Sequence, residues 1–333
     1  MRLPSIPLKF DQLRCVVNTP DMSASQPKSD RKKSLDLLAF ALLVACCCFW
    51  GYQQILIKAT IAEVPPLWQA SIRFAGATLL LVLWCFVRGI PLFTRDGTSK
   101  AGLLAGTLFT LQLAGVYLGI QYTAASRQTV FLYIAPFVVA IMLPHFIPEE
   151  RLRRAQWVGL ILAFSSVGLA LSEGLMHSKP GQMRGDLMAV GSGLLWGMSI
   201  LSIRTSALAR VSAEKTMLYQ VLVPALALPL GSLLWGETWS FHYSVAAGTS
   251  LLLQTLVGGF VSFLTWMWLL RHYPTTLVSS FSFLTPVFAL FFGAGLLQED
   301  VSLKLLIALA GVASGMLLMN KTLLTSSKIL AKE

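Results

Sequence analysis

Charged residues are scarce in this chain of 333 residues. They make up 12% of it, hydrophobic residues make up 55%, and the mean hydropathy is +0.69. A soluble domain carries roughly 25% charged residues, so this chain has too few to cover a surface in water. The shortage argues against soluble enzymes, nucleic-acid binders and disulfide-stapled secreted domains. It predicts an all-α integral membrane protein with the lipid bilayer as its solvent.

Residues that bind metals or carry catalysis are also few. The five cysteines and four histidines have no metal-ligand or disulfide spacing. Cys46, Cys47 and Cys48 lie together in an apolar run, as small buried hydrophobic residues do. The chain has no G-x-S-x-G, H-E-x-x-H or P-loop motif. We therefore expect no cofactor, no metal site and no enzymatic activity.

Ten apolar blocks account for most of the chain. Each is long enough to cross a bilayer as a helix, and helices satisfy their own backbone hydrogen bonds in lipid. The blocks cover residues 35–58, 66–87, 101–121, 125–147, 155–173, 186–204, 215–235, 246–270, 274–297 and 302–320. We predict ten transmembrane helices, a disordered cytoplasmic N-terminal tail over 1–34 and a cytoplasmic C-terminal tail over 321–333. Translation from either Met1 or Met22 is compatible with the polar leader.

Basic residues lie mostly between the blocks and give a net charge of +11. With the N-terminus inside, 20 of the 26 Lys and Arg residues fall in inside segments and three in outside loops. The other three, Lys58, Arg73 and Arg127, lie within blocks. The positive-inside rule predicts that both termini are cytoplasmic and that the protein lies in the plasma membrane, the inner membrane of a bacterium. Nucleic acid is not an expected partner.

Paired motifs recur in the two halves of the chain in the same order. In the first and sixth blocks a Trp-Gly pair precedes a basic residue, and in the fourth and ninth blocks a polar and aromatic face precedes a proline and then an acidic pair. The pairs are Trp50-Gly51 with Lys58 and Trp196-Gly197 with Arg204, then Ser126, Thr129, Tyr133, Pro136 and Glu149-Glu150 with Thr276, Ser279, Phe283, Pro286 and Glu299-Asp300. A unit of five helices is odd, so the second copy crosses the membrane in the opposite direction. We predict two inverted five-helix repeats, over 35–173 and 186–320.

Together these motifs resemble EamA-type members of the drug/metabolite transporter superfamily over residues 35–320. The resemblance implies two EamA-like repeats around a central cavity, and a carrier of small polar metabolites, expected to export amino acids or related carboxylate-bearing solutes by alternating access. A nucleotide-sugar or organic-phosphate antiporter stays open as an alternative, as does a non-transporting membrane assembly or receptor protein. The chain is expected to act as a monomer or homodimer.

Polar side chains inside the blocks are the candidate substrate-cavity residues, because polar groups in lipid are costly and usually functional. The predicted set is Trp50, Gln53, Arg73, Gln112, Ser126, Arg127, Gln128, Thr129, Tyr133, Trp196, Gln254, Thr276, Ser279 and Phe283, with helix kinks at Pro136 and Pro286. Arg73 and Arg127 indicate an anionic substrate group. A packing hydrogen bond for Arg73 and snorkelling for Arg127 are the alternatives. No aspartate or glutamate lies mid-block, which disfavours proton coupling through such a carboxylate.

Overall fold

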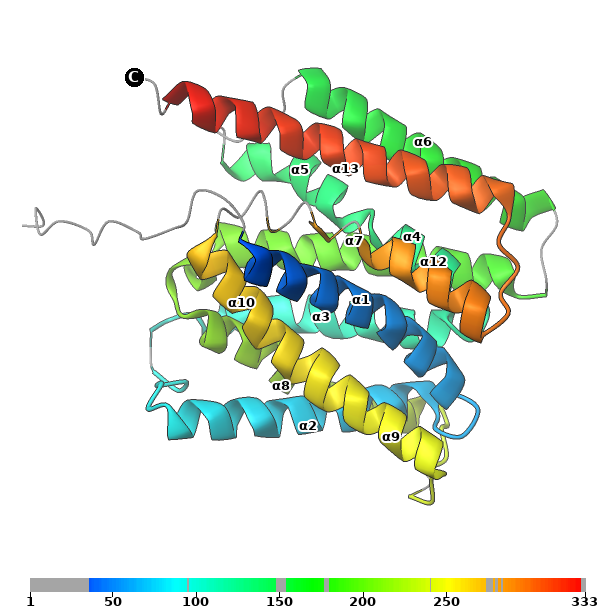
Figure 1. Ribbon diagram of the computed structural model, residues 1–333. Helices are drawn as coiled ribbons and strands as arrows, with labels where there is room; N and C mark the ends of the chain where they lie inside the picture. Colours follow the sequence, from blue (N-terminus) through cyan, green and yellow to red (C-terminus); the bar gives the residue numbers. More distant parts are fainter. Residues whose placement is uncertain are drawn as a thin grey trace, which may run out of the picture.

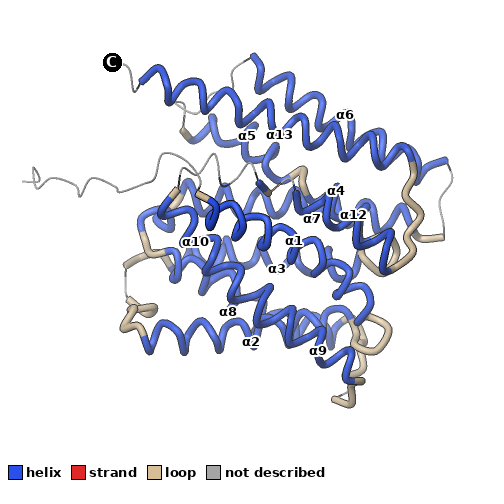
Figure 2. Tube along the Cα trace, in the orientation of Figure 1, coloured by secondary structure: helices blue, strands red, loops and turns tan. Residues whose placement is uncertain are grey.

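The computed structural model describes residues 36–94, 96–147, 154–176, 180–239, 241–273, 278, 281–282 and 284–330. Over these residues the chain consists of helices and connecting loops, with no strand (Figure 2). The predicted N-terminal tail lies outside the described residues, as do three predicted cavity residues, Thr276, Ser279 and Phe283.

The helices follow the predicted apolar blocks closely. The first half contains α1 (Leu37–Thr60), α2 (Pro66–Val87), α3 (Ser99–Gly119), α4 (Ala125–Leu132), α5 (Ala135–Phe146) and α6 (Arg154–Met176). The second contains α7 (Gln182–Thr205), η2 (Ala207–Arg210), α8 (Ala213–Leu234), α9 (Val245–Leu253), η3 (Gln254–Val261), α10 (Ser262–His272), α12 (Leu284–Leu296) and α13 (Leu303–Leu330). Seven helical stretches of the described chain are long and apolar enough to span a membrane, and α6, α12 and α13 contribute shorter apolar stretches.

Three elements differ from the predicted blocks. The block over 125–147 is two helices, because α4 ends at Leu132 and α5 begins at Ala135. Pro136 explains the break, since its ring has no N–H and collides with the carbonyl of Leu132 in a continuous helix. The block over 246–270 contains a π-helix, η3, between α9 and α10. The last helix, α13, runs ten residues past the predicted end at 320, to Leu330.

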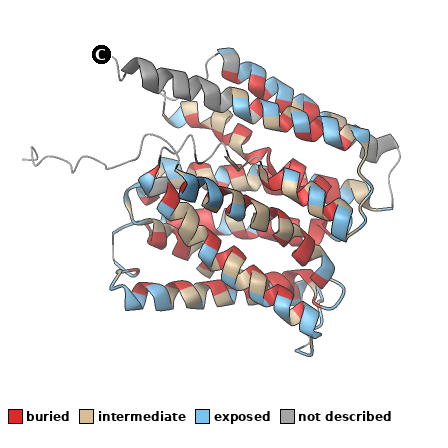
Figure 3. Cartoon of the chain, viewed as in Figure 1, coloured by how far each residue is buried: buried red, intermediate tan, exposed pale blue. Residues whose placement is uncertain are grey.

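The helices form a bundle with one peripheral helix pair on each side. Helices α6 and α13 pack along each other at the top of Figure 1, and α2 packs along α8 at the bottom. Helices α1, α3, α4, α7 and α12 lie between these pairs. The outward faces of α2 and α8 carry exposed apolar side chains such as Leu83, Phe86 and Leu230, and Figure 3 shows buried residues concentrated on the inward faces. This distribution suits a bundle surrounded by lipid.

Helices α1 and α7 run in opposite directions. Lys58, near the last residue of α1, donates a hydrogen bond of 2.6 Å to the carbonyl oxygen of Thr123. The Thr123 hydroxyl donates one of 2.7 Å to Asp186, which is near the first residue of α7. The end of α1 therefore lies beside the start of α7. We call this the Glu299 end of the bundle, after the residue that joins α1 to α4 there, and the opposite end, where α8 begins, the Lys215 end.

The two Trp-Gly glycines make equivalent contacts with the other half of the chain. A Cβ atom placed on Gly51 would lie 2.9 Å from the carbonyl oxygen of Thr285, the residue before Pro286. A Cβ atom on Gly197 would lie 2.9 Å from the carbonyl oxygen of Ala135, the residue before Pro136. The backbones of α1 and α12, and of α7 and α5, thus approach at distances that only glycine permits. The two recurring motifs of the sequence meet across the halves in both copies.

Candidate functional site

A hydrogen-bonded polar cluster lies at the start of the π-helix η3. Arg73 of α2 is 5% exposed, and its Nη1 donates a hydrogen bond of 3.2 Å to the hydroxyl of Tyr117 in α3. That hydroxyl donates to Gln254 Oε1 at 3.3 Å, and Gln254 Nε2 donates to Ser250 Oγ at 3.0 Å. Thr60 of α1 bonds Ser250 at 2.6 Å. We call these five residues the Arg73 cluster; it contains two of the predicted cavity residues, Arg73 and Gln254.

The Arg73 cluster carries a positive charge that no carboxylate of the described residues neutralises. The described residues supply no carboxylate partner for Arg73, and its Nε atom is buried without a hydrogen-bond partner. Its guanidinium carbon lies 5.1 Å from the ring centroid of Phe74, a contact that adds weak cation–π attraction. A buried cation in this state can bind an anion with little competition from neighbouring groups.

Two glutamines next to the Arg73 cluster have unpartnered amide atoms. Gln53 is 8% exposed and its Oε1 has no partner. Gln69 is fully buried and neither its Oε1 nor its Nε2 has one. Gln53 was among the predicted cavity residues and Gln69 was not. The sequence does contain a signal for Gln69, because it lies four residues before Arg73 and therefore on the same face of α2.

The π-helix η3 packs against α1 at Gln53. A Cβ atom on Gly258 of η3 would collide with Gln53 Oε1, so the glycine makes room for that side chain. π-Helical segments are rare and occur frequently at functional sites. Predicting one from the sequence would require knowing that α1 packs against this stretch, which is a long-range contact.

Arg127 lies in a second cluster, at the Glu299 end, where a carboxylate pairs with it. Its side chain forms a salt bridge to Asp186 with a shortest distance of 2.8 Å, and these two side chains are 4% and 0% exposed. Arg127 Nη2 also donates to the carbonyl oxygen of Ala170. Asp186, the first residue of the apolar block over 186–204, was not predicted as a site residue. The salt bridge makes Arg127 a poor binding group for an anion.

Glu299 connects α4 of the first half to α1. Its carboxylate accepts hydrogen bonds of 2.6 and 3.1 Å from the backbone N–H groups of Ala125 and Ser126, and one of 2.7 Å from the Ser126 hydroxyl. Lys58 Nζ lies 3.2 Å from the same carboxylate. A negative charge at a helix N-terminus is favourable. The partner of Glu299 is thus Lys58, a residue distant in the sequence.

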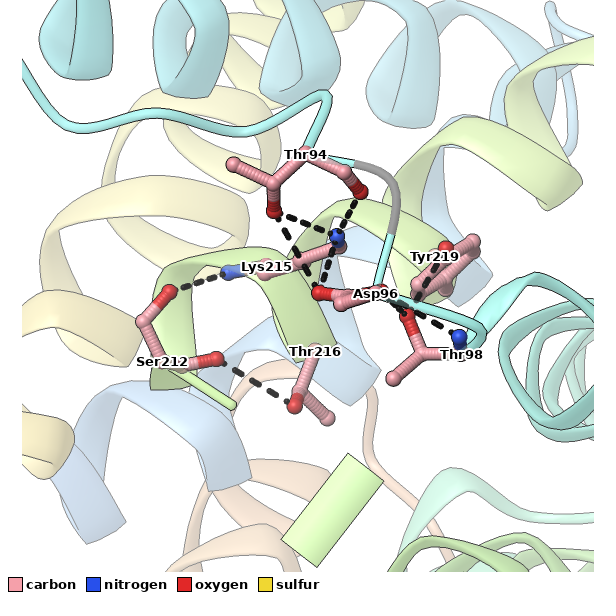
Figure 4. Close-up of polar contacts among 7 residues, drawn as sticks. All are labelled: Thr94, Asp96, Thr98, Ser212, Lys215, Thr216 and Tyr219. Atoms are coloured by element: carbon pink, nitrogen blue, oxygen red, sulfur yellow. Dashed lines mark hydrogen bonds and ion pairs between the residues drawn. The ribbon is translucent and has the colours of Figure 1, made fainter. Parts of the chain in front are cut away.

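A separate ion pair lies at the Lys215 end. Lys215, near the start of α8, donates to the carbonyl oxygen and hydroxyl of Thr94 at 2.7 and 2.9 Å and bonds to the carboxylate of Asp96 (Figure 4). Hydrogen bonds from Lys215 and Thr98 lower the pKa of Asp96. A cavity of about 260 Å³ opens beside these residues. Lys215 therefore ties the loop between α2 and α3 to α8.

The remaining predicted residues have separate surroundings. Trp50 donates to Ser262 at 2.9 Å, and Tyr133 packs edge to face on Trp196 with ring centroids 6.1 Å apart. The others form local contacts: Gln128 Nε2 donates to the Val116 carbonyl oxygen at 3.1 Å, Thr129 donates to the Ala125 carbonyl oxygen at 2.7 Å, and Gln112 is 6% exposed with an unpartnered Oε1. The predicted set is thus divided among several places in the bundle.

Comparison with known proteins adds a family and a fold. The model of the EamA-like transporter family matches residues 37–172 and 183–321. The uncharacterized transporter YoaV of Bacillus subtilis is 22% identical over 82% of this chain and 93% of its own length. The uncharacterized inner membrane transporter YedA of Escherichia coli K12 is 26% identical over 79% of this chain and 84% of its own length. A solved crystal structure, 18% identical, covers 85% of this chain and 97% of its own with a TM-score of 0.62.

Proposed function

Because the chain belongs to the EamA-like transporter family, we propose that it is a secondary transporter that exports small polar metabolites by alternating access. The substrates we propose carry a carboxylate, as amino acids and related solutes do. The observation that carries this proposal is the guanidinium of Arg73, which is buried in a polar cluster and has no carboxylate partner among the described residues. An anionic substrate group would supply that partner.

The charges in the bundle favour a substrate with one anionic group. Arg127 is already neutralised by Asp186, and Lys215 by Asp96. Arg73 is then the one cation at the cluster around η3 available to an anion among the described residues. A diphosphate or sugar nucleotide carries two or more negative charges and needs several cations around it. The nucleotide-sugar or organic-phosphate antiporter is therefore the less favoured alternative.

We propose that alternating access in this protein depends on an inverted repeat of five helices. Three observations support it: the family model matches the chain twice, α1 and α7 are antiparallel, and Gly51 and Gly197 make the same contact in opposite halves. Counting α4–α5 and α9–α10 as single spans, we propose ten crossings of the membrane. Two copies in opposite orientation offer equivalent pathways to the two sides of a membrane.

We propose that the ion pairs at the two ends of the bundle break and form in turn, so that one end is held closed while the other is open. At the Glu299 end, Lys58–Glu299 joins α1 to the loop between α12 and α13, and Arg127–Asp186 joins α4 to α7. At the Lys215 end, Lys215–Asp96 ties α8 to the loop before α3. Alternating access requires one end to open while the other stays closed. We propose that the Lys215 end faces the cytoplasm, because the inside segments of the sequence hold most of its basic residues.

Transport by the purified chain in proteoliposomes tests the proposal. We expect carboxylate solutes such as threonine and asparagine to move, and we expect Arg73→Gln to lower their initial rate about tenfold or more, since a charge-assisted contact with substrate is lost. Arg88→Gln is the matched control, because Arg88 is an exposed residue at the end of the same helix. Equal rates for wild type and Arg73→Gln would refute the assigned role of Arg73.

A further inference from the structure

We propose that Gln69, with Arg73 and Gln53, forms a subsite that recognises a neutral substrate group able to donate and accept hydrogen bonds, such as a hydroxyl or a carboxamide. This inference rests on the proposed transport function. It narrows the substrates to carboxylates that also carry such a group.

The evidence is a set of buried hydrogen-bonding atoms without partners. Gln69 is 0% exposed, Arg73 5% and Gln53 8%, so each is more than nine-tenths buried. The unpartnered atoms are two acceptors, Gln53 Oε1 and Gln69 Oε1, and two donors, Gln69 Nε2 and Arg73 Nε. Buried polar groups in proteins nearly always have partners, and each exception calls for an explanation. A substrate with the complementary atoms is the explanation we propose.

Arg73 and Gln53 border the same element, η3, and Gln69 lies one helical turn before Arg73 on α2. Arg73 reaches Gln254 of η3 through the Tyr117 hydroxyl. Gly76, three residues after Arg73, lies against Thr255 of η3, and Gln69, Arg73 and Gly76 share one face of α2 by their spacing. Gln53 lies against Gly258 of η3 from the side of α1. The π-helix is thus bordered by unpartnered polar atoms from two neighbouring helices.

The chemistry of these atoms selects the kind of group that would bind. An amide presents a donor and an acceptor side by side. A carboxamide pairs with it reciprocally, and a hydroxyl donates to Gln69 Oε1 while it accepts from Nε2. An ammonium group cannot accept from Nε2, and it would place a second positive charge near Arg73. Arg73 Nε, the remaining donor, suits the substrate carboxylate.

Pairs of isosteric solutes test the subsite in proteoliposomes containing the full chain. Threonine and valine have nearly the same shape, but threonine has a hydroxyl where valine has a methyl group. Asparagine and leucine are likewise similar in shape, but asparagine has a carboxamide where leucine has an isopropyl group. We expect wild type to transport the polar member of each pair at least about tenfold faster, because a site built to bond a polar group rejects an analogue that lacks it. Gln69→Met should reduce this ratio to below about twofold. The exposed Gln121→Met is the matched control and should leave the ratio unchanged.

A stability measurement separates a substrate-binding role from a packing role. Replacing an unpartnered buried amide by an apolar side chain of similar length removes a cost, so the melting temperature of empty Gln69→Met should equal or exceed that of wild type. A clear fall in melting temperature would mean that the amide holds the fold together and would overturn the inference. An unchanged selectivity ratio would do the same, and would assign the free amide atoms to bound water.

The two proposals fail in different ways. If no carboxylate solute moves, or Arg73→Gln transports as well as wild type, the proposed function fails and the subsite falls with it. If carboxylates move in an Arg73-dependent manner while Gln69→Met keeps the wild-type ratio, the transport function stands and the Gln69 subsite alone is refuted.

Discussion

At the scale of single residues, the partner of a buried charge decides what the charge can do. Arg127 and Arg73 are both arginines inside apolar helices, and both are less than 6% exposed. Arg127 donates to Asp186, so its charge stabilises the contact between α4 and α7. Arg73 donates to the uncharged Tyr117 and has no carboxylate partner in the part of the chain that the structure describes, so we propose that its charge serves a ligand. The same residue type has a structural role in one place and a proposed binding role in the other.

Removing one member of the Arg127–Asp186 pair should be far more harmful than removing both. Asp186→Asn removes the carboxylate charge that pairs with the buried Arg127 guanidinium, and breaking a buried pair in this way costs about 3–5 kcal/mol. We expect a large fall in the melting temperature of the purified protein in detergent. The double variant Arg127→Met with Asp186→Asn should recover most of that loss, because it leaves no buried charge. If Asp186→Asn alone were as stable as wild type, this result would contradict the structural role of the pair.

The sequence was informative about which residues are polar in lipid and much less so about their partners. Arg73, Gln254 and Ser126 stood out because they interrupt apolar blocks. Asp186 is 59 residues from Arg127 and Glu299 is 173 residues from Ser126, so nothing local in the chain indicates either pairing. Hydrogen-bond satisfaction is likewise a property of the folded bundle, so the unpartnered amide atoms of Gln69 are visible only in the structure.

At the scale of elements, glycine and proline set the contacts between helices. Proline acts locally, so the kink predicted at Pro136 follows from the sequence, and α4 does end just before it. The glycines act at long range. Gly51 and Gly197 each sit against a backbone carbonyl of a helix in the other half, and Gly258 accommodates Gln53 beside η3. The repeated Trp-Gly pairs were visible in the sequence, but their contact surface was not.

A methyl group at either Trp-Gly glycine should push two helices apart. At Gly197 the added Cβ would lie 2.9 Å from the Ala135 carbonyl oxygen and 2.8 Å from Val138 Cβ. Because backbone atoms cannot move aside, we expect Gly197→Ala to cost about 1–3 kcal/mol, as overpacking typically does, and Gly51→Ala to behave alike. Gly191 of the same helix has open space around its Cβ position, so Gly191→Ala is the control. Equal melting temperatures for the 191 and 197 variants would contradict the close approach.

At the scale of the whole molecule, ionic contacts lie at both ends of the bundle. A cluster of them lies at the Glu299 end, and one ion pair lies at the Lys215 end. This arrangement suits the carrier that we propose, which opens from either side. The Glu299 end joins segments of both halves through Glu299 and Asp186. The Lys215 end joins them through a different pair, Lys215 and Asp96. The carrier that we propose alternates between opening at one end and opening at the other. Inverted copies suit this alternation, because the same motion within each copy opens opposite sides of the membrane. The direction of each half in the membrane is therefore the property on which the carrier mechanism depends.

Labelling of two equivalent positions can test that direction. Ala62 follows α1 and Ala209 follows α7, so they occupy corresponding places in the two halves, and both are exposed. In inverted copies we expect Ala62→Cys to react with a membrane-impermeant maleimide on intact cells, and Ala209→Cys to react only after permeabilisation. The native cysteines of the described chain are buried or half-buried, and unmodified protein measures their background. If both positions react from the same side, the two halves are parallel. Parallel halves do not offer equivalent pathways to the two sides of the membrane, so this result would contradict the proposed alternating access.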